Sequence, residues 1–119
     1  MNERGNGLLL VMIDVEPAHE EDFNRWYDEE HLPERLQCKG FVSARRFLSV
    51  EGEPKYLAIY ELEDVEVLDQ EAYQQLLPPS EWMQRLTPHF TQFVRNVYRD
   101  ITPEVLDGYR VNAVREARA

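Results

Sequence analysis

The sequence is poor in cysteine and in glycine-rich motifs. Cys38 is the only cysteine, which excludes an internal disulfide and a thiolate metal cluster, and we expect an inert thiol. The 5 glycines form neither a phosphate-binding loop nor a G-x-G-x-x-G spacing. A G-x-S-x-G nucleophile motif is missing too. These absences argue against nucleotide cofactors and nucleophilic hydrolases.

Basic charge is also scarce. The chain carries 23 acidic residues against 13 basic ones, for a net charge of -10. Nucleic acids and anionic membrane surfaces favour a basic face, so neither is an expected partner. The histidines His19, His31 and His89 show no ligand spacing, so no metal is expected. The sequence thus predicts a protein that works without a cofactor.

Long apolar runs are missing as well. The longest, residues 7–13, is far shorter than the roughly 20 residues of a membrane span. It leads into Asp14 without the small-residue cleavage site of a signal peptide. We interpret it as a buried strand and expect a cytoplasmic protein.

Four strands and two helical regions emerge from the apolar patterns. Strands are predicted at 7–15, 41–50, 55–62 and 89–101, and helical regions near 16–31 and 65–86. This βαββαβ order predicts an α+β, ferredoxin-like domain with a four-stranded antiparallel sheet.

The expected domain spans residues 7–101. Residues 1–6 are expected to be a disordered N-terminus, and 102–119 a C-terminal extension that could pack on a dimer partner. Strand 7–15 is apolar at both odd and even positions, which indicates a sheet covered on both faces. Helices cover one face, so we expect a second copy to cover the other in a homodimer.

Pro33 interrupts an otherwise helical pattern. The helix that carries Trp26, Tyr27 and His31 on one side is predicted to break or kink at 31–33, because proline lacks an N–H and disfavours helical geometry at the preceding residue. Ser80 follows the pair Pro78-Pro79 and is the expected N-cap of a later helical segment.

Three stretches of the sequence resemble a known family. "FNRWYDEEHLPERL", "KGFVSARRF" and "EGEPKYLAIYEL" look like the EthD-like proteins of the dimeric α+β barrel superfamily. The W-Y-x-x-x-H-x-P spacing carries most of this resemblance. It implies a homodimeric barrel with a pocket between sheet and helices in each subunit, and it matches the family's histidine to His31. Superfamily members include cofactor-free monooxygenases, isomerases, cyclases, dehydratases and haem-using enzymes, so the fold is implied more sharply than the reaction.

The candidate catalytic residues lie in that motif. His31 could act as a general acid or base with a pKa near neutrality, assisted by Tyr27 and Asp28, or it could simply cap the broken helix. Trp26 is expected in the core or in the wall of a pocket. Tyr60 could line a cavity beside its strand, or it could simply pack in the core.

Arg45 and Arg46 are neighbours in a strand and therefore point to opposite faces. At least one then leans toward a covered side, where it could stabilise an enolate or a substrate carboxylate. The alternative is an ion pair with a carboxylate such as Asp14, Glu61 or Asp28.

The first hypothesis is a cofactor-independent enzyme acting on a small apolar or aromatic oxygenated metabolite. Dehydration or another lyase step, cyclisation and isomerisation driven by proton transfer all suit these residues. The second hypothesis is a non-catalytic homodimer that binds a small ligand, or an accessory protein of a catabolic pathway. A weaker third is a cofactor-free monooxygenase or a haem-binding barrel, with His31 or His89 as the axial ligand.

Overall fold

The computed structural model describes residues 5–103, 105 and 106. It contains an antiparallel sheet of 4 strands in the order β2-β3-β1-β4. The strands are β1 (Gly7–Val15), β2 (Phe41–Leu48), β3 (Tyr56–Leu62) and β4 (Phe90–Arg99). Helical segments follow β1 and β3, so the fold is the predicted ferredoxin-like α+β arrangement.

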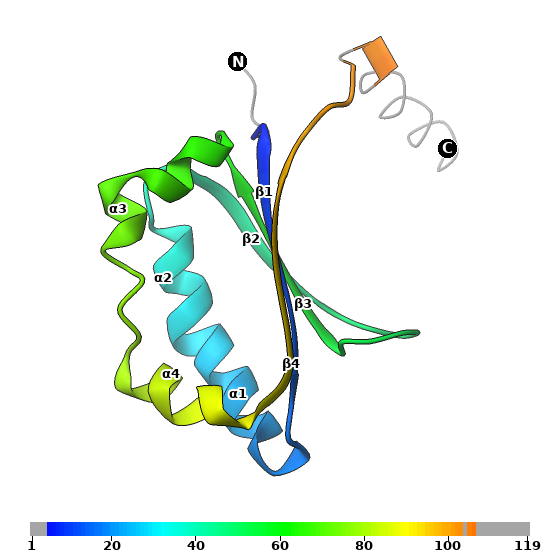
Figure 1. Ribbon diagram of the computed structural model, residues 1–119, viewed down its shortest axis with the longest axis vertical. Helices are drawn as coiled ribbons and strands as arrows, with labels where there is room; N and C mark the ends of the chain where they lie inside the picture. Colours follow the sequence, from blue (N-terminus) through cyan, green and yellow to red (C-terminus); the bar gives the residue numbers. More distant parts are fainter. Residues whose placement is uncertain (1–4, 104, 107–119) are drawn as a thin grey trace.

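The helical segments that connect the strands all lie on one side of the sheet, and no described segment packs across its other face, which we call the uncovered face (Figure 1). They are η1 (Pro17–His19), α1 (Glu20–Trp26), η2 (Tyr27–His31), α2 (Leu32–Leu36), η3 (Val65–Asp69), α3 (Glu71–Gln74), α4 (Glu81–Leu86) and η4 (Thr87–His89). Between β3 and β4 the expected helical region is therefore a series of short pieces. Within the described part of the chain, no helix is long and apolar enough to cross a membrane.

Of the break or kink predicted at 31–33, the break is wrong, because the helix that carries the W-Y-x-x-x-H-x-P motif continues through Pro33. Leu32 keeps helical dihedral angles (φ -64°, ψ -48°), and α1, η2 and α2 follow one another as one continuous helix (Figure 1). The Leu32 N–H donates to the Tyr27 carbonyl five residues earlier, which makes η2 a π-helical turn. This wider turn accommodates Pro33, which has no N–H to donate, without ending the helix.

The core lies between this long helix and the sheet. Phe23, Leu62 and Leu86 are fully buried there. The Glu30 carboxylate ties α4 to the long helix, because it accepts hydrogen bonds from the Trp26 indole (2.8 Å) and from the Ser80 hydroxyl (2.6 Å). Ser80 also accepts from the Met83 N–H (3.1 Å), which confirms it as the N-cap of α4.

The uncovered face of the sheet is largely apolar. Strand pairing places Leu10 beside Ile59, and Met12 beside both Leu57 and Val94, with their side chains directed away from the helices. β1 is thus apolar on both faces, as its sequence indicated.

The ends of the chain can be described only in part. Residues 1–4 and most of the expected extension at 102–119 lie outside the described residues. Asn6, which was expected to be disordered, forms backbone hydrogen bonds with Glu63 (3.0 Å) and Asp100 (2.8 Å).

Gly40 and Gly52 offer a matched test of packing. Both have positive φ angles, 94° and 96°, so alanine at either position is strained by roughly 1–2 kcal/mol. At Gly40 a Cβ would also lie 2.6 Å from the buried Val67 side chain, whereas at Gly52 it meets nothing within 4 Å. We expect Gly40→Ala to lower the free energy of unfolding by about 1–3 kcal/mol more than Gly52→Ala, measured by urea denaturation. Equal losses would contradict this packing, and Val67→Ala should reduce the difference.

Candidate functional site

A partly enclosed pocket lies between the long helix and the sheet. Its volume is about 200 Å³, and its walls come from α1, η2, α2, α3, α4, β1, β3 and β4. Apolar strand side chains such as Leu9, Val11 and Phe93 form its floor. The polar groups on its lining are His31, three tyrosines and two arginines. This combination of an apolar cavity and a few converging polar groups is typical of small-molecule sites.

The π-helical turn places His31 in this pocket. In a π-helix, residues five positions apart come to nearly the same face, because each turn holds more residues than in an α-helix. The His31 ring accordingly stacks on Trp26, with centroids 4.5 Å apart and planes at 28°. It also meets the Tyr27 ring edge-on at 5.1 Å. In a regular α-helix, His31 and Trp26 would point in different directions.

Burial keeps the His31 imidazole neutral. Loss of solvent, together with the nearby positive charge of Arg35, lowers its pKa from 6.5 to about 3. The sequence suggested a pKa near neutrality, and the aromatic enclosure makes the difference. At physiological pH the ring can therefore donate and accept hydrogen bonds, but it is a weak base.

Two buried tyrosines face the same space. Tyr60 is only 1% exposed, and its hydroxyl has no hydrogen-bond partner among the described residues. Burial raises the pKa of Tyr60, and the Tyr27 hydroxyl adds to the shift, although the two hydroxyls do not meet the geometry of a hydrogen bond. Burial likewise raises the pKa of Tyr27. Both phenols are protonated at neutral pH and are available as donors.

Two arginines that sequence reasoning missed complete the pocket. Arg35 is 7% exposed, and its guanidinium lies over the Tyr73 ring at 5.6 Å. Arg95 reaches the same tyrosine from β4 and donates to its hydroxyl (3.2 Å). Arg35 follows His31 by one helical turn, a spacing that would have revealed it had the helix been predicted to continue through Pro33. No local signal marks Arg95, because its position depends on which face of β4 is covered.

The structure brings together four of the predicted site residues and separates three. Trp26, Tyr27, His31 and Tyr60 line the pocket. The others, Asp28, Arg45 and Arg46, are not part of its lining.

The three separated residues have clear locations. Asp28 follows Tyr27 by one position and so points outward, with 63% of its side chain exposed. There it forms an ion pair with Arg46 (2.9 Å), which is one of the ion pairs that the sequence suggested. Arg46 lies 4.5 Å above the Tyr27 ring, on a different side from the pocket. Arg45 points to the uncovered sheet face and contacts the Phe47 ring at 4.9 Å.

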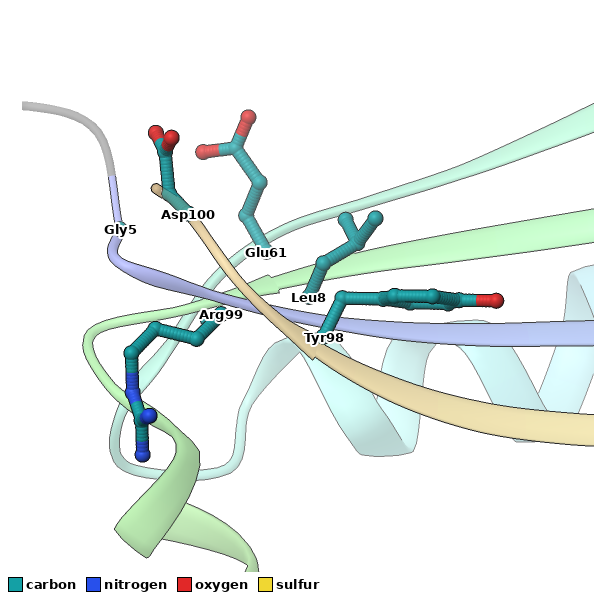
Figure 2. A pocket seen from close by; sticks show the side chains of 7 residues that line it. Gly5, Leu8, Glu61, Tyr98, Arg99 and Asp100 are labelled. Atoms are coloured by element: carbon teal, nitrogen blue, oxygen red, sulfur yellow. The ribbon is translucent and has the colours of Figure 1, made fainter. Parts of the chain in front are cut away.

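A second hollow, of about 290 Å³, lies at one end of the uncovered sheet face. Figure 2 shows Leu8, Tyr98 and the carboxylates of Glu61 and Asp100 on the same side of the sheet, while Arg99 points to the opposite side. Although larger, it contains no histidine and holds no buried unpartnered donor, so the pocket at His31 is the better candidate. Among the described residues, no group of three potential ligands could hold a metal ion.

The neutral state of His31 predicts how the free energy of unfolding changes with pH. Because the pKa is about 3 in the folded protein and 6.5 when the ring is exposed to water, the unfolded chain binds the proton first as the pH falls. His31 therefore leaves stability unchanged above pH 6.5 and lowers it by up to about 1.4 kcal/mol per pH unit below that. We expect His31→Gln to flatten the fall in unfolding free energy between pH 6.5 and 4 in urea titrations. His19→Gln is the control, since His19 stacks on His89 outside the pocket. Identical pH profiles for His31→Gln and the parent would contradict the buried, neutral ring.

Known structures share this fold at low sequence identity. A dimeric ferredoxin-like protein from an uncultured marine organism has a TM-score of 0.66 and 16% identity, with 85% of this chain and 92% of that chain covered. A putative antibiotic biosynthesis monooxygenase from Bordetella bronchiseptica has a TM-score of 0.61 and 17% identity, covering 82% and 99%. The heme-degrader MhuD from Mycobacterium tuberculosis, with two hemes bound in its active site, has a TM-score of 0.57 and 14% identity, covering 82% and 97%.

These likenesses show that the chain shares the ferredoxin-like fold of those structures. No match was found among curated proteins. A family match covers residues 7–107, which is most of the chain and includes every residue of the pocket. The chain therefore belongs to the family described as Domain of unknown function (DUF4286).

Proposed function

We propose that this protein binds a small apolar or aromatic oxygenated metabolite in the pocket at His31 and catalyses a proton transfer on it without a cofactor. The observation that carries the proposal is the convergence of a neutral imidazole and a buried, unpartnered tyrosine hydroxyl on one apolar cavity. Its volume of about 200 Å³ is below the roughly 300–1,000 Å³ of drug-sized ligand pockets, which favours a ligand of about one ring.

The reaction would begin at a carbon beside a substrate carbonyl. The Tyr60 hydroxyl donates a hydrogen bond to the carbonyl oxygen and stabilises the enolate that forms. His31 takes the proton from the carbon. The developing negative charge beside the ring favours the imidazolium form, which offsets the weak basicity of the free imidazole. Returning the proton to another carbon completes an isomerisation, and protonating a departing hydroxide as water completes a dehydration.

Other motif residues would support this step indirectly. Tyr27 and Trp26 hold the imidazole between them and help exclude water. Arg46, fixed by Asp28, stacks on Tyr27 and would position it, rather than contact the substrate. The EthD-like resemblance of the W-Y-x-x-x-H-x-P motif supports a dehydratase, another lyase or an isomerase.

Two other functions have some support. The low pKa of His31 favours a non-catalytic ligand-binding protein, since a good general base has a pKa near the working pH. Fold likeness to putative antibiotic biosynthesis monooxygenases favours oxygen chemistry, which substrate-dependent oxygen uptake would detect. A haem does not fit the pocket as it stands, because a porphyrin is much larger than a cavity of about 200 Å³.

We further propose that two copies pair through the uncovered sheet face. The apolar side chains on that face would be shielded from water by a second sheet, and one similar structure is described as dimeric.

The catalytic proposal predicts large losses of activity from two small substitutions. With aromatic lactones or polyketide-like aldols as substrates, His31→Gln should lower kcat/KM by about 10²–10⁴-fold, because it removes the proton acceptor. Tyr60→Phe should lower it by about 10²–10³-fold through loss of the hydrogen bond to the enolate. Tyr98→Phe, on the other face of the sheet, is the matched control. If His31→Gln keeps parental turnover, the acid/base role is wrong.

The dimer proposal predicts that charge on the uncovered face separates the subunits. The parent chain should show the mass of two chains in light scattering after size exclusion, and Ile59→Asp should shift it toward one. Val50→Asp is the control, because Val50 is fully exposed and lies outside the strands. A parent protein with the mass of one chain would rule out the proposed pairing.

A further inference from the structure

The lining of the His31 pocket has a charge opposite to that of the whole protein. The chain carries 23 acidic and 13 basic residues, yet the lining includes Arg35 and Arg95 and neither an aspartate nor a glutamate. A random patch of so acidic a chain would more often be negative. The local excess of positive charge therefore calls for a specific explanation.

The two arginines reach the pocket from opposite walls and meet at Tyr73. Arg35 comes from α2 and lies over the ring face, and Arg95 comes from β4 and donates to the hydroxyl. Each guanidinium carries five N–H donors, so these contacts leave donors unused. Tyr73 holds both cations at the same end of the cavity.

Protein carboxylates do not balance this charge fully. Arg35 pairs through one nitrogen with its neighbour Glu34 (2.8 Å), whose own side chain is 43% exposed to solvent. Within the described residues, Arg95 forms no ion pair with a carboxylate. The buried Arg35 charge therefore has only a partial partner, which costs free energy, and Arg95 at the exposed edge of the pocket is free of a competing carboxylate in the described part of the chain; an anionic ligand could pair with both.

The remaining polar groups also suit an anion. The Tyr60 hydroxyl is buried, protonated and unpartnered, and can only gain by donating to an oxygen in the cavity. The His31 ring lies 6.4 Å from the Tyr60 ring, between centroids, and, being neutral, does not repel an anion. The apolar walls leave room for a ring beside the charged group.

We infer that the pocket takes a small ring compound bearing a carboxylate, whose charge is held by Arg35 and Arg95 while its ring packs among Trp26 and the apolar strand residues. This inference rests on the proposed function for the location of the site, but it concerns binding alone and requires no turnover. It transfers to Arg35 and Arg95 the anion-stabilising role that the sequence suggested for Arg45 and Arg46.

Benzoate and benzamide test the inference, because they share a ring and a planar head group but differ in charge. In calorimetric titrations of the full chain at neutral pH, benzoate should bind at least about tenfold more tightly than benzamide. Arg95→Gln should reduce benzoate affinity about tenfold and leave benzamide affinity nearly unchanged. Arg95 lies at the exposed edge of the pocket, so the variant should fold, which its Tm checks.

Arg99→Gln is the matched control, since Arg99 lies on the same strand but does not line this pocket. Its benzoate affinity should equal that of the parent. Equal affinity for the two probes, or unchanged benzoate affinity in Arg95→Gln, would overturn the anion site while leaving the pocket in place. If neither probe binds, both the anion site and the proposed small-ligand function fail. If benzoate binds as expected but no substrate turns over, the anion site stands and the catalytic proposal fails.

Discussion

The hydrogen bond from the Leu32 N–H to the Tyr27 carbonyl determines the geometry of the candidate site. It widens the helix by one residue at the place where Pro33 cannot donate, so the helix continues instead of ending. Two consequences follow. His31 turns onto Trp26, and Arg35 arrives one turn later at the same cavity. Without this wide turn the imidazole and the guanidinium would still share a face of the helix, but that face would point away from Trp26.

Burial then determines the protonation states of the side chains that the π-helical turn brings together. The aromatic enclosure removes water from the imidazole and from the Tyr60 hydroxyl, so both stay uncharged at physiological pH. The fixed charges in the pocket are the arginines. A strongly acidic protein thereby presents a small interior space of positive potential, in which donors outnumber acceptors. Such a space suits the oxygen atoms of a carbonyl, an enolate or a carboxylate.

The sheet separates the candidate site from the surface proposed for dimer formation. Its helix-facing side supplies the pocket floor, and its other side presents an apolar surface across the two central strands. Neighbouring residues in a strand point to opposite faces of the sheet, as Arg45 and Arg46 illustrate. The strand pattern predicted that one of the pair would lean toward the covered side. Asp28 was among the three partners that the sequence suggested, but the pattern could not predict that Asn24 would also bind Arg46 on the outer side of Tyr27.

The sequence by itself determined the order of strands and helices, the two apolar faces of β1 and the placement of Tyr27 and His31 on one face of the helix. These follow from local periodicity, which depends on neighbours a few residues apart. Only the tertiary structure decided that the helix passes through Pro33 and that Arg35, Tyr73 and Arg95 meet there. Both outcomes depend on contacts that form when helix and sheet come together. These contacts decide whether a backbone N–H bonds to the carbonyl four or five residues earlier, and how residues far apart in the chain pack. Local sequence carries no record of those contacts.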